Sequence, residues 1–155
     1  QALSAAHPEI EIGIFDLPGV LEGTQSRFAS DGLGKRIALH PGDFFSDSFP
    51  SGYDCMTLLR ILHDHDDDAA MSILRSAREA LPSGGRLVIA EPMASTPDSE
   101  PMGDAYFGLY LWAMRSGRPR SADELKAMLH EVGFAKAARV ETGQPLITSI
   151  VVAEN

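Results

Sequence analysis

The stretch RILHDHDDDAAM, at residues 60–71, contains the side chains most capable of chemistry. Residues 63–68 hold two histidines and four aspartates in succession. An imidazole titrates near neutral pH, so His63 or His65 could accept a proton or bind a metal ion. Aspartates at the start of a helix can also serve only as N-cap and helix-dipole residues. The stretch therefore indicates a catalytic base, a metal site or an acidic helix start.

The elements on either side place His63 where either a base or a structural histidine could lie. Residues 53–62, YDCMTLLRIL, are almost continuously apolar and predict a strand that is covered on both faces. Residues 67–81 have the apolar spacing of an amphipathic helix. His63 follows the strand directly, and ligands of α/β sheets bind outside the carboxyl ends of the strands. We therefore expect His63 at the mouth of a crevice as a general base, with a structural loop histidine as the alternative.

The aspartates have a simpler interpretation. Asp66 or Asp67 is a natural N-cap, and Asp68 adds negative charge to the first helical turn. Asp64 lies between the two histidines and could steady the loop that carries His63. We interpret the other three aspartates as structural.

A metal site is the competing interpretation of residues 63–68. The letters HDHDDD are similar to the H-x-H-x-D-H pattern of binuclear zinc hydrolases, but position 68 is Asp where that pattern has His. The remaining histidines are only His7, His40 and His130, which makes three or four metal ligands hard to assemble. We predict no metal ligands and keep a metal-dependent hydrolase using His63–Asp68 as the lesser alternative.

Strand-like and helix-like segments alternate along the chain. Strands are predicted at residues 11–15, within 36–45, and at 53–62, 86–92, 137–142 and 146–155. Helices are predicted at 20–32, 67–81, 103–115 and 121–133, the last with a capping box of Ser121 and Glu124. This order predicts an α/β fold with a mainly parallel sheet, helices on both faces and a C-terminal antiparallel hairpin.

Polar residues occur where the predicted strands end. Asp16 could accept hydrogen bonds from ribose hydroxyls, and Asp43 with Phe44 could contact a nucleobase. Turn residues and a core aromatic are the alternative. Because carboxyl ends of parallel strands share one edge, we expect five side chains to converge there: Asp16, Asp43, His63, Asp64 and Glu91.

Composition limits the class of protein. The 155 residues are 44% hydrophobic and 23% charged, as expected of one globular domain over residues 1–155. The net charge of -9 argues against a nucleic-acid partner. No apolar run is long enough to span a membrane, and no signal peptide is visible. The single cysteine, Cys55, is predicted to be buried in its strand and suits a reducing cytoplasm.

Several motifs in order resemble one enzyme family. They are IFDLP, GDFF, LLRILHDHDDDAAMSILRSAREALPSGGRLVIAEPM and SADELKAMLHEVGF. Together they resemble the class I S-adenosylmethionine-dependent O-methyltransferases, in the branch of plant phenolic and bacterial small-molecule enzymes. The segment GDAYFGLYLWAMRSGRPRSADEL is most similar to the hydroxyneurosporene (demethylspheroidene) O-methyltransferases of purple bacteria. The resemblance covers almost the whole chain and implies a Rossmann-like methyltransferase sheet.

The resemblance also implies roles for individual residues. His63 matches the catalytic base, and Glu91 matches a family acid near the base and substrate. Asp64 or Glu91 could steady His63. The positions that match cofactor contacts are Asp16 and Leu17 for ribose and adenosine, Asp43 and Phe44 for adenine, and Leu59, through its backbone, where many relatives have lysine. The positions that match the substrate-lining helix are Leu109, Tyr110 and Met114.

The sequence departs from the family pattern in three places. Pro119 stands where plant relatives carry a second glutamate. His65 stands where many relatives have tryptophan, and some carotenoid members have tyrosine at the position of His63. The family's helical dimerisation domain, first strand and glycine-rich loop would precede residue 1. We therefore expect a C-terminal portion of the catalytic domain, with the missing strand between the strands at 11–15 and 53–62.

The implied reaction is methyl transfer from S-adenosylmethionine to a hydroxyl of a small, apolar molecule, a carotenoid-like, polyketide or phenolic alcohol. S-adenosylhomocysteine would be the product, and a chain without the glycine-rich loop could lack bound cofactor. The resemblance implies a homodimer in the intact protein, and we expect neither a nucleic-acid partner nor a membrane span. The main alternative is a non-catalytic binding or dimerisation module with the methyltransferase fold.

Overall fold

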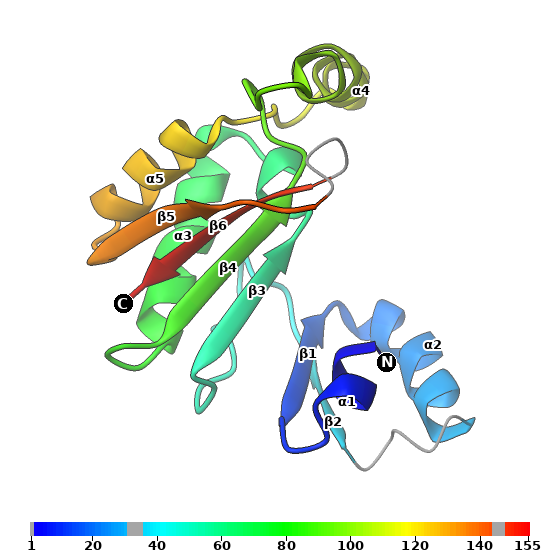
Figure 1. The fold of residues 1–155 in the computed structure, drawn as a ribbon. Coiled ribbons are helices and arrows are strands. Elements are labelled where there is room, and N and C mark those ends of the chain that lie inside the picture. The colour runs from blue at the N-terminus through cyan, green and yellow to red at the C-terminus, as the bar shows by residue number, and fades with distance from the viewer. Residues whose placement is uncertain (1, 31–35, 144–147) are drawn as a thin grey trace. The chain divides into compact units, whose positions relative to one another are not determined.

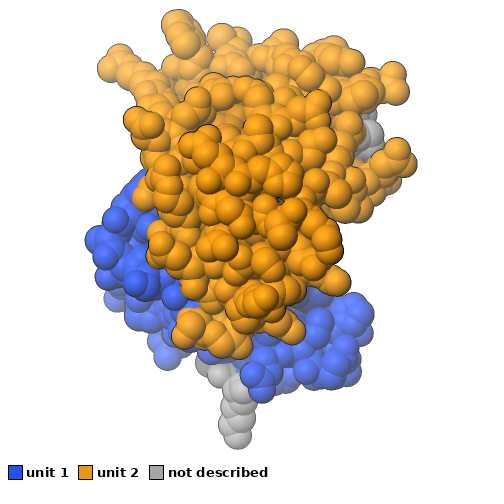
Figure 2. All heavy atoms as spheres, turned by 90° about the vertical axis from the view of Figure 1, so that its left-hand side faces the viewer, with its two compact units in different colours: residues 1–50 blue, residues 51–155 orange. Residues whose placement is uncertain are grey.

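A computed structural model of the chain describes residues 2–30, 36–143 and 148–155. The chain divides into two compact units, Gln1–Pro50 and Ser51–Asn155, which Figure 2 shows in different colours. Sequence composition predicted a single domain. The division follows the strand pairing, because the strands of each unit form a sheet of their own.

The first unit is built on one parallel pair of strands. Strand β1 (Ile12–Asp16) pairs with β2 (Ile37–Pro41) in parallel, and helix α2 (Pro18–Ser30) connects them. A parallel pair needs such a crossover, and Pro18 suits the first turn of the helix because its missing N–H would have no helical partner. A short helix, α1 (Ala2–Ala6), precedes β1 (Figure 1). The register places Asp16 opposite Pro41.

The second unit is a four-stranded mixed sheet. Its order is β3 (Cys55–Leu59), β4 (Arg86–Glu91), β6 (Ser149–Glu154) and β5 (Lys136–Val140). The first two strands are parallel, and β6 is antiparallel to both of its neighbours. The predicted α/β class and the C-terminal antiparallel hairpin are therefore confirmed (Figure 1).

Strand β3 is less buried than its apolar sequence predicted. Among its residues only Leu58 is fully buried, and Cys55 is exposed at its start, so the expectation of a buried cysteine is wrong. The reason is position, because β3 is an edge strand that pairs with β4 alone within the described residues. An apolar run does not distinguish an edge strand from a central one.

Two helices lie side by side on the sheet of the second unit. At one end, Asp67 of α3 (Asp67–Ala80) binds Arg120, which directly precedes the N-cap of α5 (Ala122–Glu131). At the other end, Arg78 Nε donates to the carbonyl of Gly133 at 2.9 Å. The capping box is also confirmed, since Ser121 and Glu124 each accept a hydrogen bond from the other's backbone N–H.

The predicted helix at residues 103–115 has two parts. A π-helical stretch, Pro101–Tyr106, leads into helix α4 (Phe107–Met114), which ends at Arg115 with a φ of 64°. Helix α4 lies beyond the carboxyl ends of β3 and β4 (Figure 1). Its buried residues are Phe107 and Leu111. Among the described residues, no helix combines the length and the apolar character needed to cross a bilayer.

Candidate active site

The chain turns sharply between β3 and α3. Arg60 follows β3 with a φ of 57°, which is uncommon for a residue with a side chain and is often found at functional sites. Its N–H donates to the carbonyl of Ala90 at 2.9 Å, and its guanidinium carbon lies 5.2 Å from the centre of the Phe107 ring. A single 3-10 turn, Leu62–Asp64, then carries His63. The backbone therefore places His63 at the carboxyl end of β3, as predicted.

The His63 ring is enclosed rather than open. Its side chain is 3% exposed, and its Nε2 lies 3.4 Å from Oδ1 of Asp64. The ring of Phe107, from α4, lies 5.9 Å away between centroids. Nδ1 is buried and has no hydrogen-bond partner among the described residues. The expected position at a crevice mouth is thus not what the structure shows, because side chains that include Phe107 pack on the ring.

The surroundings of His63 keep its imidazole neutral. Burial is the largest influence and lowers its pKa below the ordinary 6.5, and the positive charges of Arg60 and Arg120 lower it further. Asp64 opposes this shift. A ring that is neutral at pH 7 can accept a proton, and the Asp64 carboxylate stabilises the imidazolium that results.

Glu91 lies at the end of the neighbouring strand β4 and contacts the same loop. Its side chain is fully buried, and Oε2 accepts a hydrogen bond from the backbone N–H of His63 at 3.2 Å. Oε1 has no partner among the described residues. Burial raises the pKa of Glu91 to about 7, although the His63 N–H and the charge of Arg120 act in the opposite direction. The structure therefore brings His63, Asp64 and Glu91 together.

Two further aspartates of the stretch, Asp66 and Asp67, have structural contacts. Asp66 occupies the N-cap position of α3, but its Oδ1 accepts from the backbone N–H of Gly117 at 3.0 Å instead of capping the helix. Asp67 lies in the first helical turn and binds two arginines. Within residues 2–30, 36–143 and 148–155, no three His, Cys, Asp or Glu side chains are grouped as metal ligands. These contacts give no support to the hydrolase alternative.

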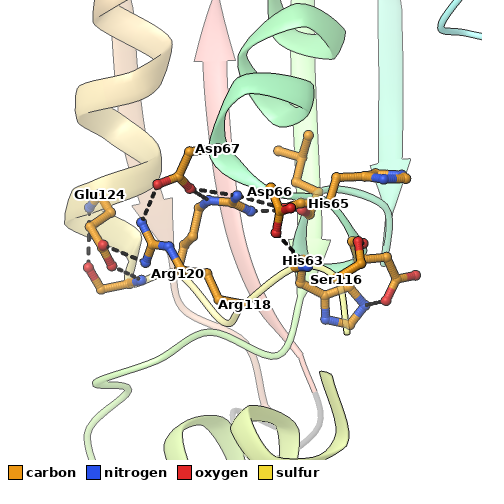
Figure 3. A network of polar contacts seen from close by, with 12 residues as sticks. His63, His65, Asp66, Asp67, Ser116, Arg118, Arg120 and Glu124 are labelled. Atoms are coloured by element: carbon orange, nitrogen blue, oxygen red, sulfur yellow. Dashed lines mark hydrogen bonds and ion pairs between the residues drawn. The ribbon is translucent and has the colours of Figure 1, made fainter. Parts of the chain in front are cut away.

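A polar network that the sequence did not indicate surrounds this loop (Figure 3). Arg120 is fully buried and donates to the carbonyls of Leu62 and His65. Asp67 holds Arg120 from the other side at 2.7 Å. The only sequence signal was opposite charge, with arginines in GRPRS and aspartates in HDHDDD, and two such segments far apart in the sequence do not identify each other as partners.

The residues predicted to bind the cofactor's nucleoside lie together in the first unit. Asp16 ends β1, and its carbonyl accepts from the N–H of Gly42, just after β2, at 3.0 Å. Asp43 therefore lies at the same end of the two-stranded sheet. Oδ1 of Asp16 accepts from the N–H of Leu17 at 2.8 Å, and Oδ1 of Asp43 accepts from the N–H of Phe45 at 2.9 Å. Carboxylates at adjacent strand ends fit the hydroxyl and amine donors of a nucleoside.

Most of the remaining predicted contacts are exposed. Leu59, the last residue of β3, and Leu17 are both more than one-third exposed, and Phe44 is partly buried. On α4, three of the exposed side chains are those predicted to line a substrate: Leu109, Tyr110 and Met114. These exposed apolar side chains are available for contact with another molecule or segment.

Comparison with known proteins identifies the family of this chain. Residues 1–135 match the family model of the O-methyltransferase domain. Demethylspheroidene O-methyltransferase of Rhodobacter capsulatus is 39% identical over 154 residues, which are 99% of this chain and 38% of that relative. The chain thus spans less than half the length of this curated relative.

Solved structures show the same fold. PigF with SAH matches 99% of this chain and 46% of that chain, at 29% identity and a TM-score of 0.89. NcsB1, in complex with S-adenosylmethionine and 2-hydroxy-5-methyl naphthoic acid, matches 98% of this chain and 43% of that chain, at 30% identity and a TM-score of 0.82. The chain therefore belongs to the O-methyltransferase domain family, whose members use S-adenosylmethionine.

Proposed function

We propose that the full-length protein transfers a methyl group from S-adenosylmethionine to a hydroxyl of a small, apolar molecule, with His63 as general base. The observation that carries this proposal is the placement of His63 between Asp64 and Glu91 at the strand ends of an O-methyltransferase fold. Relatives named for carotenoid and naphthoate substrates support an apolar alcohol or phenol as the acceptor.

Each residue has a separate part in this chemistry. S-adenosylmethionine, when bound, supplies an electrophilic methyl group. His63 takes the proton of the acceptor hydroxyl, so that the oxygen attacks as its bond to the methyl carbon forms and the carbon–sulfur bond breaks. Asp64, 3.4 Å from Nε2, stabilises the protonated ring. Glu91 holds the backbone of His63 in place.

The cofactor's nucleoside would be held by residues of the first unit. Asp16 and Asp43, at the same end of β1 and β2, would accept its hydroxyl and amine hydrogen bonds, with Leu17 and Phe44 as apolar neighbours. The apolar wall of the acceptor site would come from α4, whose side chains of Leu109, Tyr110 and Met114 are exposed.

The test is methyl transfer by the full-length protein to a panel of apolar alcohols and phenols. His63→Ala should lower kcat by roughly 10²–10⁴-fold, the usual contribution of general-base catalysis, while the Kd of S-adenosylhomocysteine stays within about twofold. The matched control is His7→Ala, which removes a side chain that is 53% exposed and should leave both values unchanged. Equal turnover in the His63 variant would exclude the base role.

The same measurements separate this proposal from the main alternative. A full-length protein that neither binds S-adenosylhomocysteine nor methylates any acceptor would favour a non-catalytic methyltransferase-fold module.

We also propose that the full-length protein is a cytoplasmic homodimer. The exposed thiol of Cys55 is typical of a reducing compartment, and exposed apolar side chains outside the proposed acceptor wall, such as Met102 and Tyr106, favour association. Sedimentation of the full-length protein at several concentrations measures the assembly state.

A further inference from the structure

Arg120 is a buried charge that the proposed reaction does not use. It lies between α4 and α5, directly before the N-cap Ser121, and its side chain is 0% exposed. A guanidinium removed from water is costly unless its donors are bonded and its charge is paired. The positions of its partners therefore show what the side chain holds.

The guanidinium binds the His63 loop on both sides of the proposed base. Nη1 donates to the carbonyl of Leu62 at 2.7 Å, and Nη2 donates to the carbonyl of His65 at 2.8 Å. Nε and Nη2 also reach Oδ1 of Asp67, at 3.0 and 2.7 Å. One planar group thus ties the two ends of residues 62–65 to the first turn of α3 (Figure 3).

Two more residues of the same connection reach the loop. Ser116 Oγ donates to the carbonyl of Asp64 at 2.8 Å, and the N–H of Gly117 donates to Oδ1 of Asp66 at 3.0 Å. Gly117 also lies so close to the carbonyl of His63 that a Cβ atom would clash with it. The segment after α4 therefore contacts every residue from position 62 to position 66.

Arg118 provides an internal comparison. It binds the same Asp67 at 3.2 Å, and Glu124 at 2.7 Å, but its side chain is 44% exposed. Arg118 binds carboxylates at the helix starts, whereas Arg120 binds loop carbonyls as well. Exposed ion pairs of this kind contribute little to stability. The two arginines therefore share the ion pair with Asp67, and Arg120 alone of the two binds the carbonyls of Leu62 and His65.

We propose that Arg120 is a positioning residue for His63, which fixes the backbone of residues 62–65 so that the imidazole keeps its place beside Asp64. This inference rests on the proposed function of His63. A displacement of about 1 Å at a catalytic group can lower turnover by about 10²-fold, so a rigid backbone at this turn has a direct effect on rate.

The charge of Arg120 gives the proposal a second, independent signature. Arg120 lowers the pKa of His63 and also that of Glu91. The groups that face His63 from the surrounding elements are Asp64, which raises its pKa, Arg60, Arg120 and His65, which lower it, and Glu91, which binds its N–H. Loss of the Arg120 charge should therefore raise the pKa of His63, which a purely structural salt bridge on the surface would not do.

The experiment uses the full-length protein and three variants. Arg120→Gln removes the charge, Arg120→Lys keeps the charge without the planar fork, and Arg118→Gln is the matched control. The readouts are kcat and KM over pH, the NMR titration of His63 assigned with His63→Ala, and hydrogen exchange of the backbone amides of residues 62–66.

We expect Arg120→Gln to lower kcat by about 10²-fold with KM for S-adenosylmethionine within about twofold, and to raise the pKa of His63. Arg120→Lys should keep that pKa but lower kcat and speed exchange in residues 62–66. Arg118→Gln should match the wild type in all three. If Arg120→Gln does not fold, Arg120→Lys decides: wild-type kcat and wild-type exchange in that variant would overturn the proposal.

Exchange and titration do not depend on turnover. Faster exchange at residues 62–66 in Arg120→Lys, in a protein that methylates no acceptor, would leave the positioning contact standing and count against the proposed function alone. Unchanged exchange in a protein that is an active methyltransferase would overturn the positioning role alone.

Discussion

The backbone N–H of His63 donates to the buried carboxyl of Glu91 at 3.2 Å, although the two residues lie 28 positions apart in the sequence. The contact joins the loop after β3 to the end of β4, its parallel neighbour in the sheet. It also places a titratable acid, with a pKa raised to about 7, next to a base whose pKa is lowered. The two groups therefore have opposite effects on the pH dependence of folding.

In the Glu91→Gln variant, the free energy of unfolding should no longer fall as pH rises from about 4.5 to about 7. Since burial raises the pKa of Glu91 from 4.5 to about 7, the folded protein keeps a proton that the unfolded chain releases. The stabilisation is complete below about pH 4.5 and is lost as pH rises through about 7, a fall of about 3 kcal/mol. Glutamine still accepts the His63 N–H and should not show this fall.

Urea unfolding between about pH 4 and about pH 8 measures the effect as the difference between wild type and variant. His63 contributes in the opposite sense, because the unfolded chain binds a proton below about pH 6.5 that the folded protein excludes. Both proteins keep His63, so the difference between them reports the Glu91 carboxyl together with its influence on His63. Glu131→Gln, at an exposed position, is the control and should follow the wild type. If the unfolding free energy of Glu91→Gln falls over this pH range as much as that of wild type, Glu91 is not the group responsible.

Local and pattern-based features of the fold were predictable from the sequence. The capping box of Ser121 and Glu124 involves residues three apart, so sequence spacing is sufficient to identify it. The contact of His63 with Glu91 also followed from the rule that parallel strands end at one edge. The exposure of Cys55 did not follow, because an apolar run does not show which strand lies at an edge.

Arg120 was not predictable for a different reason. Its partners lie 53 to 58 residues away, and two of them are backbone carbonyls that any residue type would offer. Enclosure of His63 by Phe107 is similar, since α4 is apolar on nearly every side and its sequence does not indicate which ring turns inward. Such contacts depend on tertiary packing rather than on local pattern.

Phe107→Ala should uncover the His63 ring and raise its pKa toward the ordinary 6.5. Burial is the largest cause of the lowered pKa, and Arg60, which lies over the same Phe107 ring, lowers it too. Removing the ring relieves the burial, which is the largest of the causes that lower this pKa. The free energy of unfolding should fall by about 3–5 kcal/mol, because the Phe107 side chain is buried.

An NMR titration of His63 and urea unfolding measure the two effects. Trp112→Leu removes an aromatic side chain of the same helix that is 77% exposed, and it should change neither value. A substrate hydroxyl can reach the enclosed ring only if the packing on it changes, so Phe107→Ala also tests whether this side chain limits access. An unchanged pKa in that variant would show that other atoms keep His63 from water.

Gly117→Ala should destabilise the loop that carries His63. Gly117 has a φ of 76°, which is unfavourable for alanine, and a Cβ atom there would clash with the carbonyl of His63 and the backbone of Asp64. Neither partner can move freely, because Ser116 binds the Asp64 carbonyl and Arg120 holds the residues on either side. We expect a loss of about 1–3 kcal/mol in unfolding free energy and faster amide exchange at residues 62–66.

Gly108→Ala is the matched control for this change. Gly108 lies in α4, its added Cβ would meet only Pro119 at 4.0 Å, and its φ is not positive. Alanine is favoured over glycine inside a helix by roughly 1 kcal/mol, so this variant should be as stable as wild type or more stable. Equal stability of the two variants would mean that the connection after α4 yields to the new methyl group, and that Gly117 does not fix the His63 loop.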